Sequence, residues 1–157
     1  RMNAFVHDAL RGLLPTRIVG SDDLPWIPAA TPGKWAKPLR FLGESGFVEL
    51  LRMTPGTVMP LHRHTGEVHV HQLSGQRQLN TGEIIGPGDY VFEPAGHVDW
   101  WKVVGEEDMV AFAVVMGDVE FLGPGGEVRA RANAATQRAE YERHCAEHGL
   151  EQRDLRA

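Results

Sequence analysis

Short apolar runs with polar residues at alternate positions occur through most of the chain, and glycines and prolines separate them. The 157 residues include 18 glycines and 10 prolines. A hydrophobic period of two is typical of strands that bury one face. Closely spaced strands between turn residues are typical of β-sandwiches and barrels. The pattern predicts strands at residues 34–42, 46–54, 58–64, 68–73, 76–80, 89–94, 97–104, 109–116 and 119–123.

The two ends of the chain have helical rather than alternating spacing. Residues 4–14 form one helical pattern, and residues 134–148 form another that follows Asn133, a suitable N-cap, and stops at Gly149. Residues 21–33 are irregular and proline-rich, so we expect them to wrap around the strands or to reach a neighbouring subunit.

These patterns predict a single all-β domain in three parts. The expected parts are an N-terminal helix and proline-rich arm at 1–33, a β-barrel at 34–130, and a C-terminal helix and tail at 131–157. A chain of this length buries enough surface to fold without staples.

The composition excludes several classes of partner. Apolar residues make up 42% and charged residues 24% of the chain, as in soluble globular proteins. A net charge of −5 argues against a nucleic-acid footprint, and no apolar run is long enough to span a membrane. Cys145 is the single cysteine, which excludes an internal disulfide and favours a reducing cytoplasm.

Histidines are concentrated in one stretch, "PLHRHTGEVHVHQLSG", where His62, His64, His69 and His71 fall within ten residues. On an extended strand, His62 and His64 point to the same side, about 6.6 Å apart along the strand. Two imidazoles on one face can bind a single ion at about 2.1 Å each. Such a pair also occurs as two polar residues on an exposed strand, so its sequence setting matters.

Two glycine-containing motifs surround this pair, and together they resemble those of the cupin superfamily. The first motif is Gly, five residues, His-x-His, three or four residues, Glu, six residues and Gly, and it is matched at Gly56, His62, His64 and Gly75. The second is matched at Gly88, Pro94 and Gly96. The resemblance covers roughly residues 40–120 and implies a small, jelly-roll-like β-barrel around a metal site.

Within that superfamily, the sequence is similar to the group containing 2,4'-dihydroxyacetophenone dioxygenase. That group holds non-haem iron with three histidines and uses O2 to cleave a C–C bond beside a carbonyl; two of these histidines fall on His62 and His64. The chain departs elsewhere. Val68 or His69 occupies the Glu position, and Asp99 occupies the position of the last histidine.

The expected ligands are therefore His62, His64 and Asp99, a set of two imidazoles and a carboxylate that suits Fe(II) and leaves open coordination positions. Zinc or another divalent metal is the alternative. His97, two residues before Asp99, shares its strand face and is an alternative third ligand. His69 is a candidate for a further ligand or a cavity-wall hydrogen bonder.

The expected substrate pocket is lined by Val70, Phe92, Trp100 and Phe112. Of the adjacent Trp100 and Trp101 only one can face inward, and we assign Trp100 to the pocket. Glu67 and Glu93 have the chemistry for acid–base work, but we expect each to lie at a strand end in solvent.

The resemblance implies a metal-dependent dioxygenase that acts on a small α-hydroxyketone or diketone, with O2 as the second substrate. It also implies a homodimer. The alternative is a non-enzymatic cupin that binds a metal or small molecule, similar to the zinc-binding cupin domains of anti-sigma factors, or a cupin that has lost its metal. Metal content and oxygen consumption distinguish these alternatives.

Overall fold

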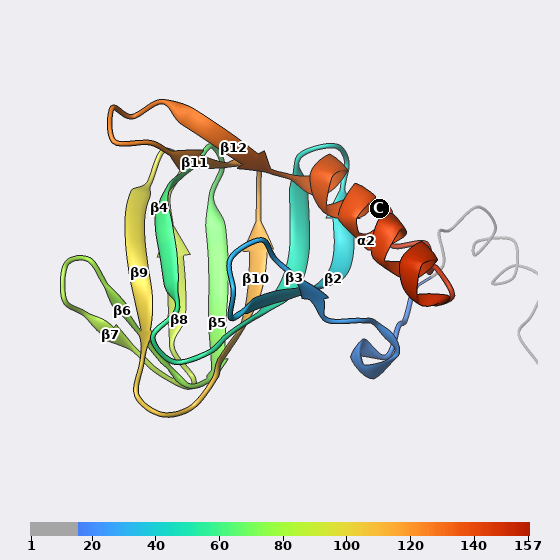
Figure 1. Ribbon diagram of the computed structural model, residues 1–157, viewed down its shortest axis with the longest axis horizontal. Helices are drawn as coiled ribbons and strands as arrows, with labels where there is room; N and C mark the ends of the chain where they lie inside the picture. Colours follow the sequence, from blue (N-terminus) through green and yellow to red (C-terminus); the bar gives the residue numbers. More distant parts are fainter. Residues whose placement is uncertain (1–15) are drawn as a thin grey trace, which may run out of the picture.

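The computed structural model describes residues 16–157, which form two antiparallel β-sheets packed against each other (Figure 1). The first sheet has the strand order β1 (Ile27–Pro28), β2 (Lys34–Leu42), β3 (Gly46–Met53), β10 (Met109–Val115), β5 (Val68–Ser74) and β8 (Tyr90–Glu93). The second has the order β12 (Val128–Ala132), β11 (Val119–Leu122), β4 (Val58–His64), β9 (Val98–Val104), β6 (Gln76–Leu79) and β7 (Ile84–Ile85).

From β3 onward, the chain passes repeatedly from one sheet to the other, which is the path of a jelly roll. The all-β, jelly-roll-like fold is therefore confirmed, although the strands form two sheets rather than one closed barrel. The helix predicted at residues 4–14 lies outside the described residues.

Each strand predicted from the sequence is present, with bounds that differ by at most one residue at either end. Three strands within residues 16–157 were not predicted. β1 and β7 contain only two residues each, too few for a period of two to be visible. β12 has the sequence VRARA, with no large apolar residue on either face except Val128. It crosses the predicted boundary at residue 130, and β1 lies within the predicted arm.

Gly75 shows why the first motif ends in glycine. Its φ is +67°, and a Cβ there would lie 2.4 Å from the carbonyl oxygen of Asp108. The backbone of β5 and the loop before β10 can approach this closely only without a side chain. The glycine therefore fixes how β5 meets β10, which is its neighbour in the first sheet.

The C-terminal helix, α2 (Ala134–His148), has the predicted bounds. At its start, Asn133 Oδ1 accepts a hydrogen bond from the Thr136 backbone N–H, and Thr136 Oγ1 accepts one from the Asn133 N–H, each at 2.9 Å. At its end, Gly149 adopts the left-handed conformation, with φ of 63°. No helix within residues 16–157 has the length and apolar character needed to cross a bilayer.

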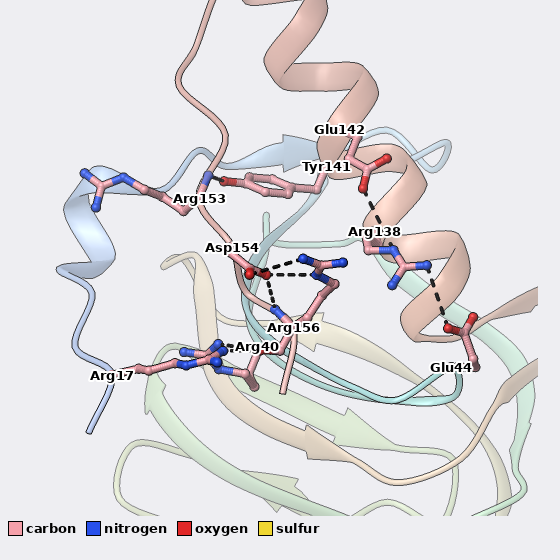
Figure 2. A network of polar contacts seen from close by, with 9 residues as sticks. All are labelled: Arg17, Arg40, Glu44, Arg138, Tyr141, Glu142, Arg153, Asp154 and Arg156. Carbon is pink, nitrogen blue, oxygen red and sulfur yellow. Dashed lines mark hydrogen bonds and ion pairs between the residues drawn. The ribbon is translucent and has the colours of Figure 1, made fainter. Parts of the chain in front are cut away.

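The segment after α2 returns along β2 and is held by backbone and side-chain hydrogen bonds (Figure 2). Phe41 N–H donates to the Leu155 carbonyl at 2.8 Å. The Tyr141 hydroxyl of α2 accepts from the Arg153 N–H at 2.8 Å, and Asp154 pairs with Arg156. These bonds fix α2 beside β2 at one end of the sheets (Figure 1).

Replacing the N-cap of α2 is expected to destabilise the fold. Asn133→Ala removes the acceptor for the Thr136 N–H and should lower the free energy of unfolding by about 1 kcal/mol. Asn133→Asp keeps an acceptor at the same place and is the matched control, expected to remain within a few tenths of a kcal/mol of wild type. Urea denaturation of the three proteins measures the difference. Equal loss in both variants would show that the cap contributes nothing specific.

Candidate metal centre and cavity

A cavity of about 710 Å³ lies between the two sheets. Apolar side chains make up most of its wall, and they come from both sheets, for example Val70, Ala111 and Ala113 from the first sheet and Trp101 and Phe121 from the second. Such a volume is typical of small-molecule sites, in which a few polar groups determine orientation. Most of the polar side chains on this wall belong to two groups.

The first polar group is built on β4, where His62 and His64 face inward as predicted. They are 3% and 6% exposed, and their ring centroids lie 4.8 Å apart with the planes at 89°. β4 pairs with β9 in a register that sets His62 opposite Asp99. Strand alternation and strand pairing together therefore bring these residues to one place.

Asp99 lies between two histidines. Its Oδ1 is 3.3 Å from His62 Nε2, and its Oδ2 is 3.1 Å from His97 Nε2. Asp99 is 3% exposed, whereas His97, at the start of β9, is half-buried at the edge of the cluster. Both of the residues considered for the third ligand position thus reach the cluster, and Asp99 is the more central of the two.

Glu93, at the end of β8, also belongs to the cluster. The expectation that Glu93 lies in solvent was wrong. It is 5% exposed, and its Oε2 is 3.3 Å from His64 Nε2. Ligand atoms of Glu93, His97 and Asp99 lie within 4.8 Å of one another. Burial, and next the charge of Asp99, raise the pKa of Glu93. Glu67 is exposed, as expected.

Arg77 on β6 is a second residue that the sequence did not reveal. It is 2% exposed, and its guanidinium carbon lies 4.7 Å from the centre of the Trp101 ring. Burial lowers the pKa of Arg77, while the charges of Glu93 and Asp99 act in the opposite direction. Arg77 is thus the cation that offsets part of the negative charge of these two carboxylates. Its position depends on the pairing of β6 with β9, which no local motif announces.

The buried donors fit a bound cation. His62 Nδ1 lies 2.8 Å from the Pro60 carbonyl, so this nitrogen donates and Nε2 presents its lone pair to Asp99. Burial lowers the pKa of His62, and it lowers the pKa of His64 to about 4, so both imidazoles are neutral at pH 7. Within residues 16–157, Glu93 Oε2 and Asp99 Oδ1 have no hydrogen-bond donor.

Lone pairs that face each other without a proton between them are unfavourable in a buried site. A divalent ion would satisfy these atoms together, and two imidazoles with carboxylates form a set that suits Fe(II) or Zn(II). Which of these residues bind the ion stays a prediction.

The predicted pocket residues are only partly correct. Val70 lines the cavity, but Phe92, Trp100 and Phe112 are 51%, 45% and 36% exposed and lie on the outer faces of the sheets. The reason is strand alternation, since Asp99 faces inward and therefore Trp101, not Trp100, does so too.

His69 also lies outside the cluster, so its candidacy as a further ligand was wrong. It alternates with the inward-facing Val68 and Val70, and its Nδ1 is 2.6 Å from the Tyr90 hydroxyl on the outer face of the sheet. His71 is exposed on the same face.

The second polar group lies on another part of the cavity wall and consists of Lys34 on β2, Glu49 on β3 and Gln137 on α2. Gln137 Nε2 donates to Glu49 Oε2 at 3.4 Å. Burial raises the pKa of Glu49 to about 7, although the positive charge of Lys34 opposes this shift. Burial lowers the pKa of Lys34. Sequence analysis identified none of these three residues.

The jelly roll and the buried histidine–carboxylate cluster are those of a cupin. Residues 15–120 match the family described as the ChrR cupin-like domain, and the chain belongs to that family. The comparison with curated proteins gives no match.

Solved structures show the same fold. An RmlC-like cupin protein from Ralstonia eutropha JMP134 is similar with a TM-score of 0.86 and 25% identity, over 92% of this chain and 96% of that one. An acetylacetone dioxygenase from Acinetobacter johnsonii is similar with a TM-score of 0.71 and 15% identity, over 85% of this chain and 94% of that one. The polyketide cyclase RemF from Streptomyces resistomycificus is similar with a TM-score of 0.55 and 21% identity, over 82% of this chain and 97% of that one. At these identities, the last two comparisons show the fold alone.

The buried carboxyl of Glu49 is expected to make stability depend on pH. Between its ordinary pKa near 4.5 and about 7, the folded protein holds a proton that the unfolded chain has lost, so the free energy of unfolding falls as pH rises. Glu49→Gln removes this titration. The variant should match wild type near pH 4.5 and exceed its stability by up to about 3 kcal/mol at pH 8.

Denaturation with urea from pH 4.5 to 8, in the presence of a chelator, measures this difference. Contributions from the histidines occur in both proteins and cancel when the two curves are subtracted. A difference that stays constant with pH would show that Glu49 is ionised throughout.

Proposed function

We propose that this protein is a metal-dependent, dioxygenase-like cupin that cleaves a C–C bond next to a carbonyl in a small α-hydroxyketone or diketone. The observation that carries the proposal is the buried cluster of His62, His64, Glu93 and Asp99, in which Glu93 Oε2 and Asp99 Oδ1 have no hydrogen-bond partner within residues 16–157. Three of its members, His62, His64 and Glu93, line a largely apolar cavity. The fold shared with an acetylacetone dioxygenase supports the reaction class.

His62, His64 and Asp99 are the proposed ligands. The Pro60 carbonyl fixes the tautomer of His62, and His97 donates to the outer oxygen of Asp99, which holds that carboxylate in place. When bound, Fe(II) would supply a Lewis acid for two substrate oxygens and a site for O2. The apolar cavity wall excludes water from the substrate.

Glu93 is the proposed proton acceptor. Its carboxyl is buried, its pKa is raised, and it lies beside the proposed ligands, so it can take a proton from the carbon next to the substrate carbonyl. The positive charge of Arg77 opposes that pKa shift and so favours the ionised form of Glu93, which is the form that accepts a proton. Loss of this proton makes the substrate carbon electron-rich, as a reaction with O2 requires.

A non-enzymatic, metal-binding cupin is the second candidate, and Glu93 is also the observation that favours it. Its Oε2 lies beside His64 Nε2 and could close the ligand set with a fourth donor. A closed set of four is typical of structural zinc, whereas catalytic sites keep an open position. The role of Glu93 therefore separates the two candidates. The homodimer and the cytoplasmic location implied by the sequence remain predictions.

The ligand assignment predicts a graded loss of metal. His62→Ala, His64→Ala and Asp99→Ala should each lower metal affinity by more than about 100-fold, beyond the range typical of outer residues. His97→Ala should stay within about 10- to 100-fold of wild type, because its ring holds Asp99 rather than the ion. His71→Ala, on the outer face, is the control and should keep full affinity.

Elemental analysis and competition with a chelator measure these affinities. Circular dichroism checks that each variant is folded. Loss of metal in His97→Ala with retention in Asp99→Ala would reverse the assignment of the third ligand. Full occupancy in folded His62→Ala and His64→Ala would remove the metal centre from the proposal.

Oxygen consumption separates the enzyme from the binding module. The iron-loaded protein should consume O2 in the presence of pentane-2,4-dione or an α-hydroxyketone, and Glu93→Gln should slow this by about 100-fold or more while it keeps its metal. If Glu93 closes a structural site, Glu93→Gln instead weakens metal binding. Zinc in the purified protein without turnover supports the binding module, and absence of metal supports a degenerate cupin.

A further inference from the structure

Lys34 on β2 places an amino group on the wall of the cavity that His62, His64 and Glu93 also line. Its Nζ lies 3.8 Å from Met59 Sδ and 5.4 Å from the centre of the Phe121 ring. That ring is itself 6.2 Å from the His62 ring, and the charge of Lys34 is among the causes that lower the pKa of His62. The ammonium group therefore faces the space next to the cluster.

The contacts of Lys34 leave much of its hydrogen-bonding capacity unused. A thioether and the face of a phenyl ring are weak acceptors, and within residues 16–157 no carboxylate oxygen approaches its nitrogen to 4.0 Å. Lys34 is half-buried, and an ammonium removed in part from water gains when an anion joins it. Nothing in the proposed ligand set requires Lys34, so its charge points to a ligand.

Glu49 is the nearest anion that acts on Lys34, and it does not neutralise the lysine by contact. The two charges influence each other without forming an ion pair, and Glu49 instead accepts a long hydrogen bond from Gln137. Lys34, Glu49 and Gln137 thus form a polar part of the cavity wall separate from the histidines. The proton that burial favours on Glu49 would make it a donor, like its two neighbours.

We infer that the cavity takes a substrate with two oxygen-bearing ends, and that Lys34 binds a carboxylate at the end remote from the metal centre. This inference rests on the proposed function, because the other end is the carbonyl group that the cluster receives. The substrate class is then a diketone or hydroxyketone that carries a carboxylate, rather than a neutral one. Lys34 determines specificity and takes no part in bond cleavage.

Two diketones that differ only at one end test this inference. In 4,6-dioxoheptanoate, a carboxylate replaces the terminal methyl group of heptane-2,4-dione. Calorimetric titration without oxygen, on protein of measured metal content, gives both affinities. Wild type should bind the acid about 10- to 100-fold more tightly, the range of a buried hydrogen bond to a charged group.

Variants then assign the preference to a residue. Lys34→Met keeps the length of the side chain without its charge, and it should bind the two diketones within about twofold of each other, with heptane-2,4-dione unaffected. Lys34→Arg should keep a preference for the acid. Lys102→Met, which removes an exposed lysine from β9, is the matched control and should keep the full preference.

Equal affinity of wild type for the two diketones, or a preference that persists in Lys34→Met, overturns the inference. If Lys34→Met does not fold, Glu49→Gln serves at pH 8, where removal of the competing anion should tighten binding of the acid alone by severalfold. No tightening there also overturns it. Failure of the proposed function gives a different result. If the proposed function is wrong, both diketones bind weakly, whereas if only the role of Lys34 is wrong, both bind and their affinities are equal.

Discussion

The pairing of β4 with β9 is the constraint on which the whole site depends. It sets His62 opposite Asp99, and a bulge between Met59 and His62 lies immediately before the histidines. Side chains alternate along both strands, so a slip of one residue in either would turn its donors to the outer face. A bulge re-aims the side chains beside it. The cluster is therefore a property of two strands held in one register, and the HxH motif supplies only half of it.

Local patterns were sufficient for the strands, for α2 and for the inward direction of His62 and His64, because each depends on residues close in sequence. The failure at Glu93 concerns pairing between distant strands. Its position at the end of a strand predicts a solvated Glu93, yet β8 pairs with β5 and sets Glu93 opposite the inward-facing Val68. Trp100 shows a different kind of failure. Trp100 follows Asp99 directly, so it must point outward if Asp99 points inward. The direction of Trp100 can therefore be assigned once the inward face of β9 is known.

Two buried carboxylates make the cluster electrostatically unfavourable without a bound cation. Glu93 and Asp99 repel each other in a buried place, and Arg77 offsets only part of that repulsion. A cation between the two carboxylates would oppose the pKa shift of Glu93 and favour its ionised form. Binding of a metal would thus release protons, so the cluster couples metal content to pH in the sense expected of a buried ligand set.

The helix α2 contributes to the cavity wall, whereas the proposed metal ligands lie on the strands β4 and β9. Gln137, Glu140 and Arg143 of this helix line the cavity, yet the family match ends at residue 120, before the helix begins. The helix is held by its own cap, by the returning C-terminal segment and by contacts with β1, β2 and β12. Substitutions on this face of α2 would therefore change the cavity wall while leaving unchanged the residues of the strands that hold the histidines.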